Sequence, residues 1–173
     1  MTEALALQIA PATPADVPLV LQLIRELAEY EKLSHEVVAT EALLHRYLFE
    51  EGPRVAAVIA RQGDEPAGFA LFFHNFSTFL GRPGIYLEDL FVRPSFRGRG
   101  IGKALLAHLA ALARDRGCGR LEWAVLDWNQ PAIDFYASIG AKIVPEWRLN
   151  RLSGDALQRL AAASSITASV PEN

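Results

Sequence analysis

The hydrophobic and polar positions at the start of the chain predict a short strand followed by two helices. Residues 5–10 alternate between apolar and polar side chains, which is typical of a half-buried strand. Thr13 in an N-cap position, with Pro14 just inside it, predicts a helix over 13–32. Apolar residues recur along this helix at three- and four-residue spacing, so one face should be buried. A second, shorter helix is expected over 40–49.

The middle of the chain changes to the two-residue period of strands. Segments 54–61, 67–77 and 85–94 each have this period, and the short connections between them predict an antiparallel meander. A helical pattern over 101–117 then leads to another strand at 120–126. Because this strand follows its predecessor through a helix, the two should pair in parallel.

The last third of the chain predicts a helix over 129–140, a closing strand over 142–152 and a further helix from 153. No repeat, linker or change in composition divides the sequence. The expected fold class is therefore α/β (α+β), with a mixed, mostly antiparallel central sheet and helices on both faces. We expect a single domain over 1–173, with its core at about 7–160 and a frayed tail at 161–173.

Composition narrows the function classes. The net charge of -3 argues against a general nucleic-acid binder, because such affinity comes from many Lys and Arg side chains. The single cysteine, Cys118, excludes an internal disulfide. The sequence lacks an apolar run long enough for a membrane span and an apolar signal-peptide region, so we expect a cytoplasmic protein without a membrane partner. The histidines show no metal-ligand spacing, so no metal is expected.

The segment "RPSFRGRGIGKALLAHL" (93–109) joins a glycine-rich turn to a helix, but it fails two nucleotide-binding patterns. The pattern GxxxxGK[ST] requires glycine where Arg97 stands and a hydroxyl where Ala104 stands. The pattern GxGxxG requires a third glycine where Lys103 stands. Neither a phosphate-binding loop of the first type nor a dinucleotide site of the second type is therefore expected.

An Arg-x-x-Gly-x-Gly turn remains, and it opens a helix. Small residues let backbone N–H groups approach a ligand, and the helix N-terminus favours negative charge. The turn therefore predicts a pyrophosphate site, and the alternative is a purely structural strand-to-helix turn. The expected contacts are Arg97, Gly98, Arg99, Gly100, Ile101, Gly102 and Lys103.

This turn and the later motif "NQPAIDFYASIG" occur in an order that resembles the GNAT superfamily of N-acetyltransferases. The resemblance covers about residues 7–150. Within it, "YLEDLFVRPSFRGRGIG" and "DWNQPAIDFYASIGA" are similar to the diamine acetyltransferase branch, which includes spermidine/spermine and thialysine acetyltransferases. The resemblance implies acetyl-CoA as co-substrate, a small amine as acceptor, a homodimer and one parallel, splayed strand pair in the sheet.

Transfer of an acetyl group to an amine requires a group that accepts the amine proton. Glu88 is our candidate base. Neighbouring residues of a regular strand face opposite sides, so Glu88 and Asp89 cannot both enter one pocket unless the strand is irregular. The resemblance implies a bulge here, which would expose the backbone of Leu90, Phe91 and Val92 to the pantetheine and the acetyl carbonyl.

Other roles follow from the resemblance. Tyr136 matches a tyrosine that contacts the cofactor and donates a proton to the coenzyme A thiolate, and Asn129 matches a cofactor-binding asparagine that can also cap a helix. Asp89, Glu146 and Trp147 are expected to bind a primary amine of polyamine, diamine or lysine-like type.

Several alternatives stay open at this level. Glu88 and Asp89 could instead form ion pairs with Arg93 or Arg148, and Asp89 or a water chain could be the base. The same motifs would also serve an enzyme that acetylates a protein or peptide, or a non-catalytic module that senses acyl-CoA.

Overall fold

The computed structural model describes residues 6–52 and 54–163. Its contacts divide the chain into two compact units, 1–124 and 125–173. The first unit contains one sheet with the strand order β1-β2-β3-β4-β5. The first three pairs are antiparallel and β4 pairs with β5 in parallel, so the expected mixed, mostly antiparallel sheet is confirmed. The strands are β1 (Leu7–Pro11), β2 (Ala56–Gln62), β3 (Glu65–Ser77), β4 (Arg82–Val92) and β5 (Leu121–Trp123).

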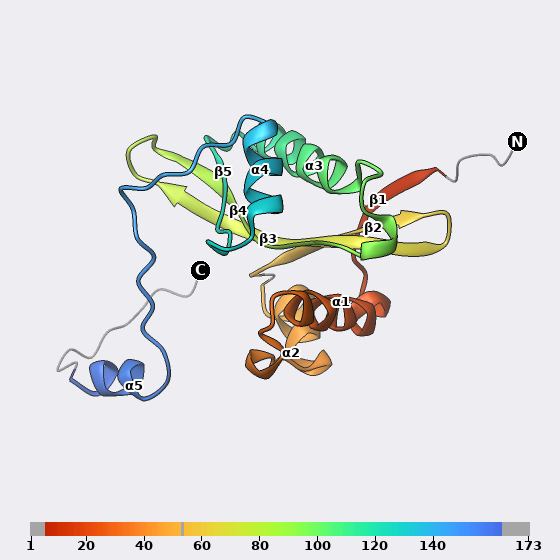
Figure 1. Ribbon diagram of the computed structural model, residues 1–173. Helices are drawn as coiled ribbons and strands as arrows, with labels where there is room; N and C mark the ends of the chain where they lie inside the picture. Colours follow the sequence, from red (N-terminus) through yellow and green to blue (C-terminus); the bar gives the residue numbers. More distant parts are fainter. Residues whose placement is uncertain (1–5, 53, 164–173) are drawn as a thin grey trace, which may run out of the picture. The chain divides into compact units, whose positions relative to one another are not determined.

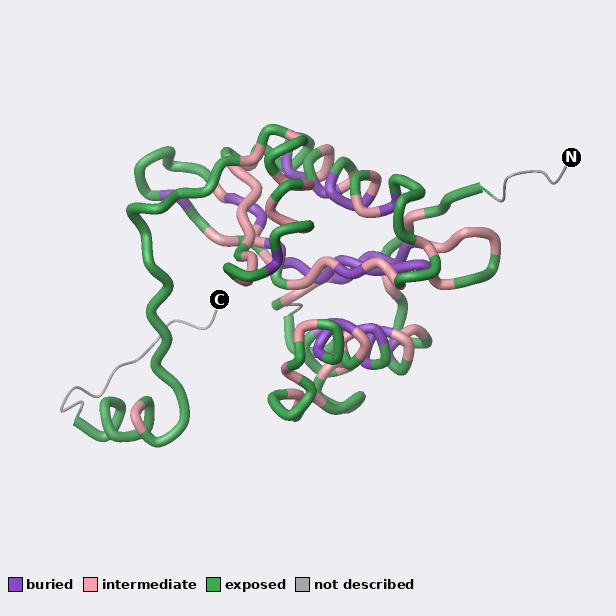
Figure 2. Tube along the Cα trace, in the orientation of Figure 1, coloured by how far each residue is buried: buried purple, intermediate pink, exposed green. Residues whose placement is uncertain are grey.

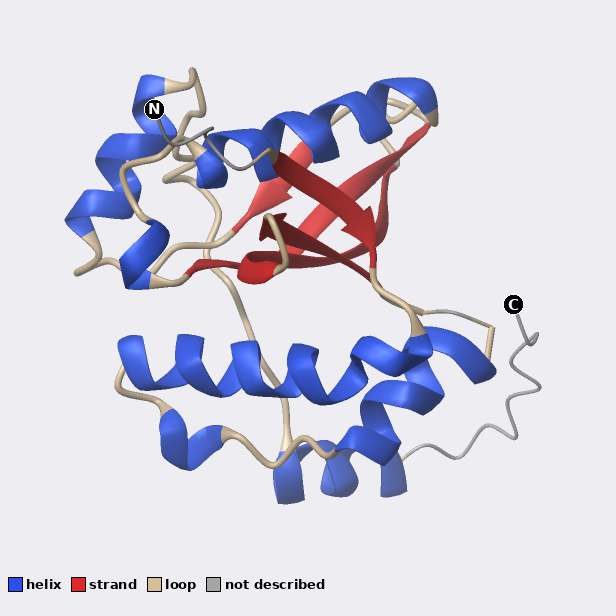
Figure 3. Ribbon diagram, turned by 90° about the vertical axis from the view of Figure 1, so that its right-hand side faces the viewer, coloured by secondary structure: helices blue, strands red, loops and turns tan. Residues whose placement is uncertain are grey.

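Helices cover both faces of this sheet, with α1 and α2 on one face and α3 on the other (Figures 1 and 3). At the start of the first helical segment, Asp16 accepts hydrogen bonds from the backbone and the hydroxyl of Thr13 at 2.9 and 2.7 Å. The predicted helix over 40–49 is present as α2 and a π-helical turn that follows it. The bounds are η1 (Pro14–Asp16), α1 (Val17–Tyr30), η2 (Ser34–Glu36), α2 (Glu41–His45), η3 (Arg46–Glu50), η4 (Pro94–Phe96) and α3 (Ile101–Asp115).

The core of the first unit lies on both faces of the sheet (Figure 2). Buried side chains of α1 pack with Phe69, Leu71 and Phe91 of β3 and β4 on one face. On α3, the buried positions are four residues apart from Ile101 to Ala113, with Leu106 beside them. Each fully buried Val, Leu, Ile or Phe side chain among them stabilises the fold by about 1.5–3 kcal/mol, so the helices are firmly held against the sheet.

Strand β4 carries a bulge at Glu88. Asp89 lies opposite Leu71 of β3, whereas Leu87 lies opposite the next residue, Phe72, so Glu88 is the extra residue of the pair. Among the described residues, β5 pairs with β4 only along 85–87. The β4 edge therefore separates from its parallel neighbour where the bulge begins. Both the bulge and the splayed pair are confirmed.

The described part of the second unit, 125–163, contains two helices, α4 (Gln130–Ser138) and α5 (Gly154–Ala162). Asn129 caps α4, because its side chain accepts a hydrogen bond from the Ala132 N–H at 3.4 Å. The predicted closing strand is wrong, since residues 142–152 form no strand. A strand needs a hydrogen-bonding neighbour, and the described part of this unit contains no other strand. Most of the predicted frayed tail, 164–173, lies outside the described residues.

Candidate active site

The N-terminus of α3 follows a glycine turn and leaves backbone N–H groups outside the hydrogen bonds of the helix. Gly98 and Gly100 adopt φ angles of 74° and 78°, in the left-handed region that favours glycine. A Cβ at either glycine would meet nothing within 4 Å, so the backbone angle, and not crowding, requires these glycines. Gly100 caps α3, and the first helical hydrogen bond runs from the Ala104 N–H to its carbonyl at 2.9 Å. The N–H groups of 101–103 therefore point out of the helix end, and the Lys103 side chain is exposed there.

Two arginines brace this turn. Arg97 donates from Nε to the Val92 carbonyl at 2.9 Å, and its guanidinium lies 4.4 Å from the ring centre of Tyr30. Arg99 donates to the Gln62 side chain at 2.9 Å. The sequence predicted that these cations would lie beside a pyrophosphate. In the structure both side chains are exposed and also form hydrogen bonds within the chain, and their contact with a pyrophosphate stays a prediction.

The edge of β4 beyond the bulge presents backbone groups from alternate residues. The Arg93 N–H donates to the Ala67 carbonyl of β3 at 2.9 Å. Because backbone groups alternate along an antiparallel strand, the N–H and C=O groups of Val92 and Leu90 face away from β3. The Arg97 hydrogen bond to the Val92 carbonyl agrees with this direction.

Phe91 faces the other way. A Cβ at Gly68 in β3 would collide with the Phe91 carbonyl oxygen, so that carbonyl points toward β3. The Phe91 ring is also buried in the core beneath α1. Three residues were predicted to expose their backbone here. Leu90 and Val92 direct their backbone groups toward the open edge, whereas Phe91 directs its carbonyl toward β3 and its ring into the core.

Three carboxylates gather at the bulge. Asp89 shares the α1 face of the sheet with its cross-strand partner Leu71, and Glu31 is the C-cap residue that follows α1. Burial, together with the negative charges of Glu88 and Glu31, raises the pKa of Asp89 to about 6. Burial also raises the pKa of Glu31. The sequence alone assigns no role to Glu31, because nothing local shows that the end of α1 lies near β4.

The position of Glu31 adds to the negative character of this site. The carbonyl groups at the C-terminus of a helix carry partial negative charge, which attracts cations. The partial negative charge at the end of α1 therefore adds to the negative charge of the three carboxylates. The N-terminus of α3, in contrast, favours anions. The first unit thus has one region that favours a cation and one that favours an anion. The contact between Tyr30, which precedes Glu31, and Arg97 of the turn connects these two regions.

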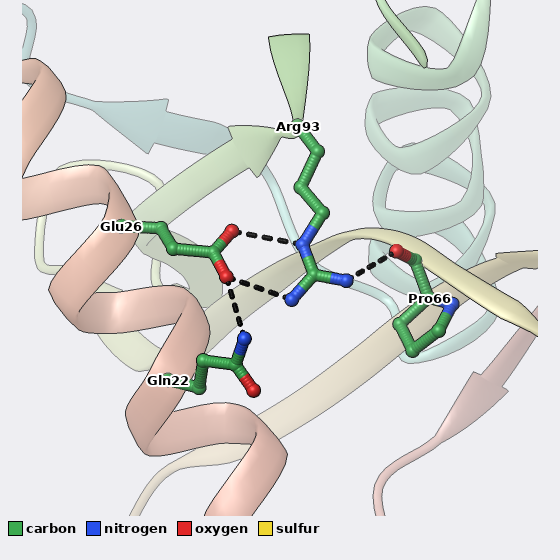
Figure 4. Close-up of polar contacts among 4 residues, drawn as sticks. All are labelled: Gln22, Glu26, Pro66 and Arg93. Atoms are coloured by element: carbon green, nitrogen blue, oxygen red, sulfur yellow. Dashed lines mark hydrogen bonds and ion pairs between the residues drawn. The ribbon is translucent and has the colours of Figure 1, made fainter. Parts of the chain in front are cut away.

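Arg93 is held by Glu26 of α1, as Figure 4 shows. Nε and one terminal nitrogen donate to the two carboxylate oxygens at 2.8 and 2.7 Å, and the other terminal nitrogen donates to the Pro66 carbonyl at 2.9 Å. Gln22 donates to the same carboxylate at 2.9 Å. The Arg93 hydrogen bond lowers the pKa of Glu26. The alternative that Arg93 pairs with Glu88 or Asp89 is therefore wrong.

The remaining predicted residues belong to the second unit. Tyr136 is half-buried in α4, with its ring centre 5.4 Å from that of Phe135. Glu146 and Trp147 lie in the irregular segment between α4 and α5, and the Trp147 side chain is 75% exposed. Asn129, the cap of α4, is buried.

Within 6–52 and 54–163, no three His, Cys, Asp or Glu side chains come together in a group that could hold a metal ion. None of the helices in these ranges has the length and apolar character needed to cross a bilayer.

Comparison with known proteins identifies the family. Residues 20–141 match the model of the acetyltransferase (GNAT) family, and the chain belongs to this family. It is therefore an acetyltransferase, and its curated relatives include amine N-acetyltransferases of the branch that the motifs indicate.

Three matches illustrate this similarity. Thialysine N-epsilon-acetyltransferase of Bos taurus is 41% identical over 164 residues, covering 88% of this chain and 96% of the relative. L-ornithine N5-acetyltransferase NATA1 of Arabidopsis thaliana is 37% identical over 198 residues, covering 88% and 87%. Among solved structures, an integron cassette protein from the mobile metagenome of V. cholerae superposes with a TM-score of 0.77 at 32% identity, covering 91% of this chain and 98% of that one.

Proposed function

We propose that this protein transfers an acetyl group from acetyl-CoA to a primary amine of a small diamine, polyamine or lysine-like substrate. The observation that carries this proposal is the charge interaction of Glu31 and Glu88 with Asp89 at the bulge of β4. A cationic amine would be attracted to these carboxylates, and one of them can accept the amine proton.

The first unit has a suitable place for the donor. The outward N–H groups of 101–103 fit a pyrophosphate, and the left-handed angles of Gly98 and Gly100 give the turn that exposes them. The open edge of β4 would bind the pantetheine through the backbone of Val92. The N–H of Leu90 would then stabilise the negative charge that develops on the acetyl oxygen.

The acceptor is expected to carry two amino groups. The relatives are named for thialysine and ornithine, and both of these amino acids have a second amine. One amine would bind as an ammonium ion to Glu31 and Glu88, while the other would react in its neutral form. We also propose that Glu146 and Trp147 of the second unit contact the acceptor chain.

Asp89 is our proposed base. Its pKa of about 6 lies closer to neutral pH than that of an ordinary carboxyl group, and it still leaves Asp89 mostly ionised at pH 7. Glu88, the first candidate, is exposed, and it contributes by raising the pKa of Asp89. In the reaction, the amine nitrogen bonds to the acetyl carbon, its proton passes to Asp89 and the carbon–sulfur bond breaks.

Tyr136 is the proposed proton donor to the departing thiolate, and Asn129 contacts the donor in addition to capping α4. A phenol is a suitable donor for this step. Replacing Tyr136→Phe should lower kcat at least tenfold while the Kd of coenzyme A changes less than about twofold. An unchanged kcat would remove the role proposed for Tyr136.

The proposed function is tested by incubating the protein with acetyl-CoA and single amines, and by measuring coenzyme A release and product mass. The amines are thialysine, ornithine, spermidine, and a lysine-containing peptide with an acetylated N-terminus. We expect the small amines to be acetylated at least tenfold faster than the peptide. Faster acetylation of the peptide would favour a protein acetyltransferase. Binding of acetyl-CoA without turnover on any amine would favour a sensor.

We also propose a homodimer. The end of β3 and the connection to β4 expose three large apolar residues, Phe76, Phe79 and Leu80, and Phe79 is 93% exposed. A second copy would remove this surface from water. Light scattering should give about twice the chain mass of 19.0 kDa, and Phe79→Asp should shift the population toward the monomer. A wild-type protein that shows only the 19.0 kDa species would contradict this proposal.

A further inference from the structure

Arg97 connects three segments of the first unit. It belongs to the glycine turn, its Nε donates to the Val92 carbonyl on the open edge of β4 at 2.9 Å, and its guanidinium lies 4.4 Å from the ring centre of Tyr30 in α1. It also lies 5.8 Å from the ring centre of Phe91. Arg97 can therefore fix the turn and the β4 edge relative to each other only while its own position is fixed.

Tyr30 is well suited to fix that position, because α1 ends in a rigid turn. The Leu33 N–H donates to the Ala28 carbonyl at 2.8 Å and the Lys32 N–H donates to the Glu29 carbonyl at 3.1 Å, which together form a Schellman motif. Lys32 takes the left-handed position of this motif with a φ of 62°. The direction of the chain around Tyr30 is thus closely determined.

A second contact holds α1 against the same segment of the chain. Glu26 and Tyr30 are one helical turn apart on α1, and they contact Arg93 and Arg97, which are also four residues apart. Figure 4 shows the first of these contacts. The Glu26 pair holds the end of β4 firmly, so the ring of Tyr30 meets Arg97 at a reproducible place.

We propose that Tyr30 is a positioning residue for the donor site. By stacking on Arg97, it keeps the guanidinium on the Val92 carbonyl and holds the glycine turn in the shape that receives the pyrophosphate of coenzyme A. Tyr30 precedes Glu31, which we place on the acceptor side, yet its effect is on the donor. This inference rests on the proposed function, because it assumes that the turn binds coenzyme A.

The expected effect is moderate. A cation–π contact at an exposed site is worth about two- to fivefold in an equilibrium constant. Removing the ring should therefore raise the Kd of coenzyme A by about this factor. The effect should depend on Arg97, because Tyr30 acts through that side chain.

The experiment measures the Kd of coenzyme A by calorimetry, without turnover, for the wild type and for Tyr30→Leu, Tyr30→Phe, Arg97→Gln and the double variant Tyr30→Leu/Arg97→Gln. Tyr30→Leu should bind about two- to fivefold more weakly, while Tyr30→Phe, which keeps the ring, should stay within about twofold of the wild type. The double variant should bind like Arg97→Gln alone, because neighbours that act as a unit are not additive.

Two controls separate positioning from a general loss of structure. Tyr47→Leu removes an exposed ring that lies 5.5 Å from the Arg46 guanidinium in the π-helical turn, and it should leave the Kd of coenzyme A unchanged. Glu31→Gln should raise the KM for the amine and leave the Kd of coenzyme A unchanged. Thermal unfolding of every variant confirms that it is folded. If Tyr30→Leu does not fold, Tyr30→Gln replaces it.

Three results would overturn the inference: a Tyr30→Leu Kd equal to that of the wild type, additive effects in the double variant, or a Tyr30→Phe variant as weak as Tyr30→Leu. In each case the wild type still binds coenzyme A, so the proposed function stands. A wild-type protein that does not bind coenzyme A overturns both the inference and the donor site.

Discussion

Glu26 in α1 binds Arg93 at the end of β4 through two hydrogen bonds of 2.8 and 2.7 Å (Figure 4). These residues are 67 positions apart in the sequence, and both side chains are largely shielded, with exposures of 29% and 21%. The pair fixes the helix that carries Tyr30 and Glu31 to the strand that leads into the glycine turn. It is therefore a structural connection between the proposed acceptor and donor sites.

Replacing Glu26→Gln should lower the free energy of unfolding at pH 7 by about 1–3 kcal/mol, because it leaves the Arg93 charge without its partner. The pKa of Glu26 is lowered in the folded protein, so its contribution is present above the ordinary glutamate range and is lost as the pH falls through its lower, folded value. Urea unfolding at pH 7 and at pH 3 measures this difference. Glu29→Gln, at an exposed position on the same helix, is the control and should change little. An equal loss of stability in both variants would contradict the role of the pair.

Replacing Asp89→Asn should abolish most activity and stabilise the fold. The folded pKa of Asp89, about 6, exceeds its ordinary value of 3.8, so the folded state binds more protons between these values and stability falls as the pH rises through them. At pH 7 the substitution removes the charge of a half-buried carboxylate. The free energy of unfolding should rise by about 1–3 kcal/mol, since one pKa unit corresponds to about 1.4 kcal/mol. Denaturant unfolding at pH 7 measures the gain.

The pH profile of the wild type gives a second measure of Asp89. Protonation of the base should make kcat/KM fall as the pH drops below about 6, and the fall should follow one titrating group. The profile should be measured with substrates whose amine pKa values differ. A limb caused by Asp89 stays at the same pH for all of them, whereas a limb caused by the amine moves with the amine pKa. A profile without a limb near pH 6 would exclude Asp89 as the base.

Replacing Glu31→Gln should change both substrate binding and this pH profile. Loss of one carboxylate should raise the KM for a diamine about tenfold, which corresponds to about 1.5 kcal/mol, the lower end of the range for a hydrogen bond to a charged group. Removing a like charge also lowers the pKa of Asp89, so the acidic limb should move to lower pH. Initial rates between pH 5 and 8 record both effects. Glu36→Gln, at an exposed position after α1, is the control.

The glycines of the turn should matter for donor binding beyond their effect on stability. Gly100→Ala should cost about 1 kcal/mol of stability, because alanine disfavours a left-handed backbone. It should also raise the KM for acetyl-CoA. Gly81→Ala is the control. Gly81 also has a left-handed φ angle, 61°, and open space around its Cβ position, but it lies in the connection between β3 and β4. It should lose similar stability with an unchanged KM. Equal KM changes in the two variants would mean that strain alone is responsible.

The sequence by itself determined the local elements and the family. The positions of α1 and α3 follow from capping residues and apolar spacing, and the turn around Gly98 and Gly100 follows from residues whose backbone angles few others adopt. These features depend on neighbours in the chain, and a sequence displays neighbours directly. Two motifs in the right order were sufficient to indicate the acetyltransferase family, which the family match confirms.

Only the tertiary structure decided which distant residues meet. Glu31, Glu26 and Tyr30 read as ordinary helix positions, and their roles appear only when α1 lies against β4 and the turn. The same reason explains the wrong strand at 142–152, because apolar alternation indicates a capacity to pair, whereas a strand forms only where a neighbour supplies hydrogen bonds. Burial and the approach of like charges also raise the pKa of Asp89, and both depend on distances that the order of residues does not contain.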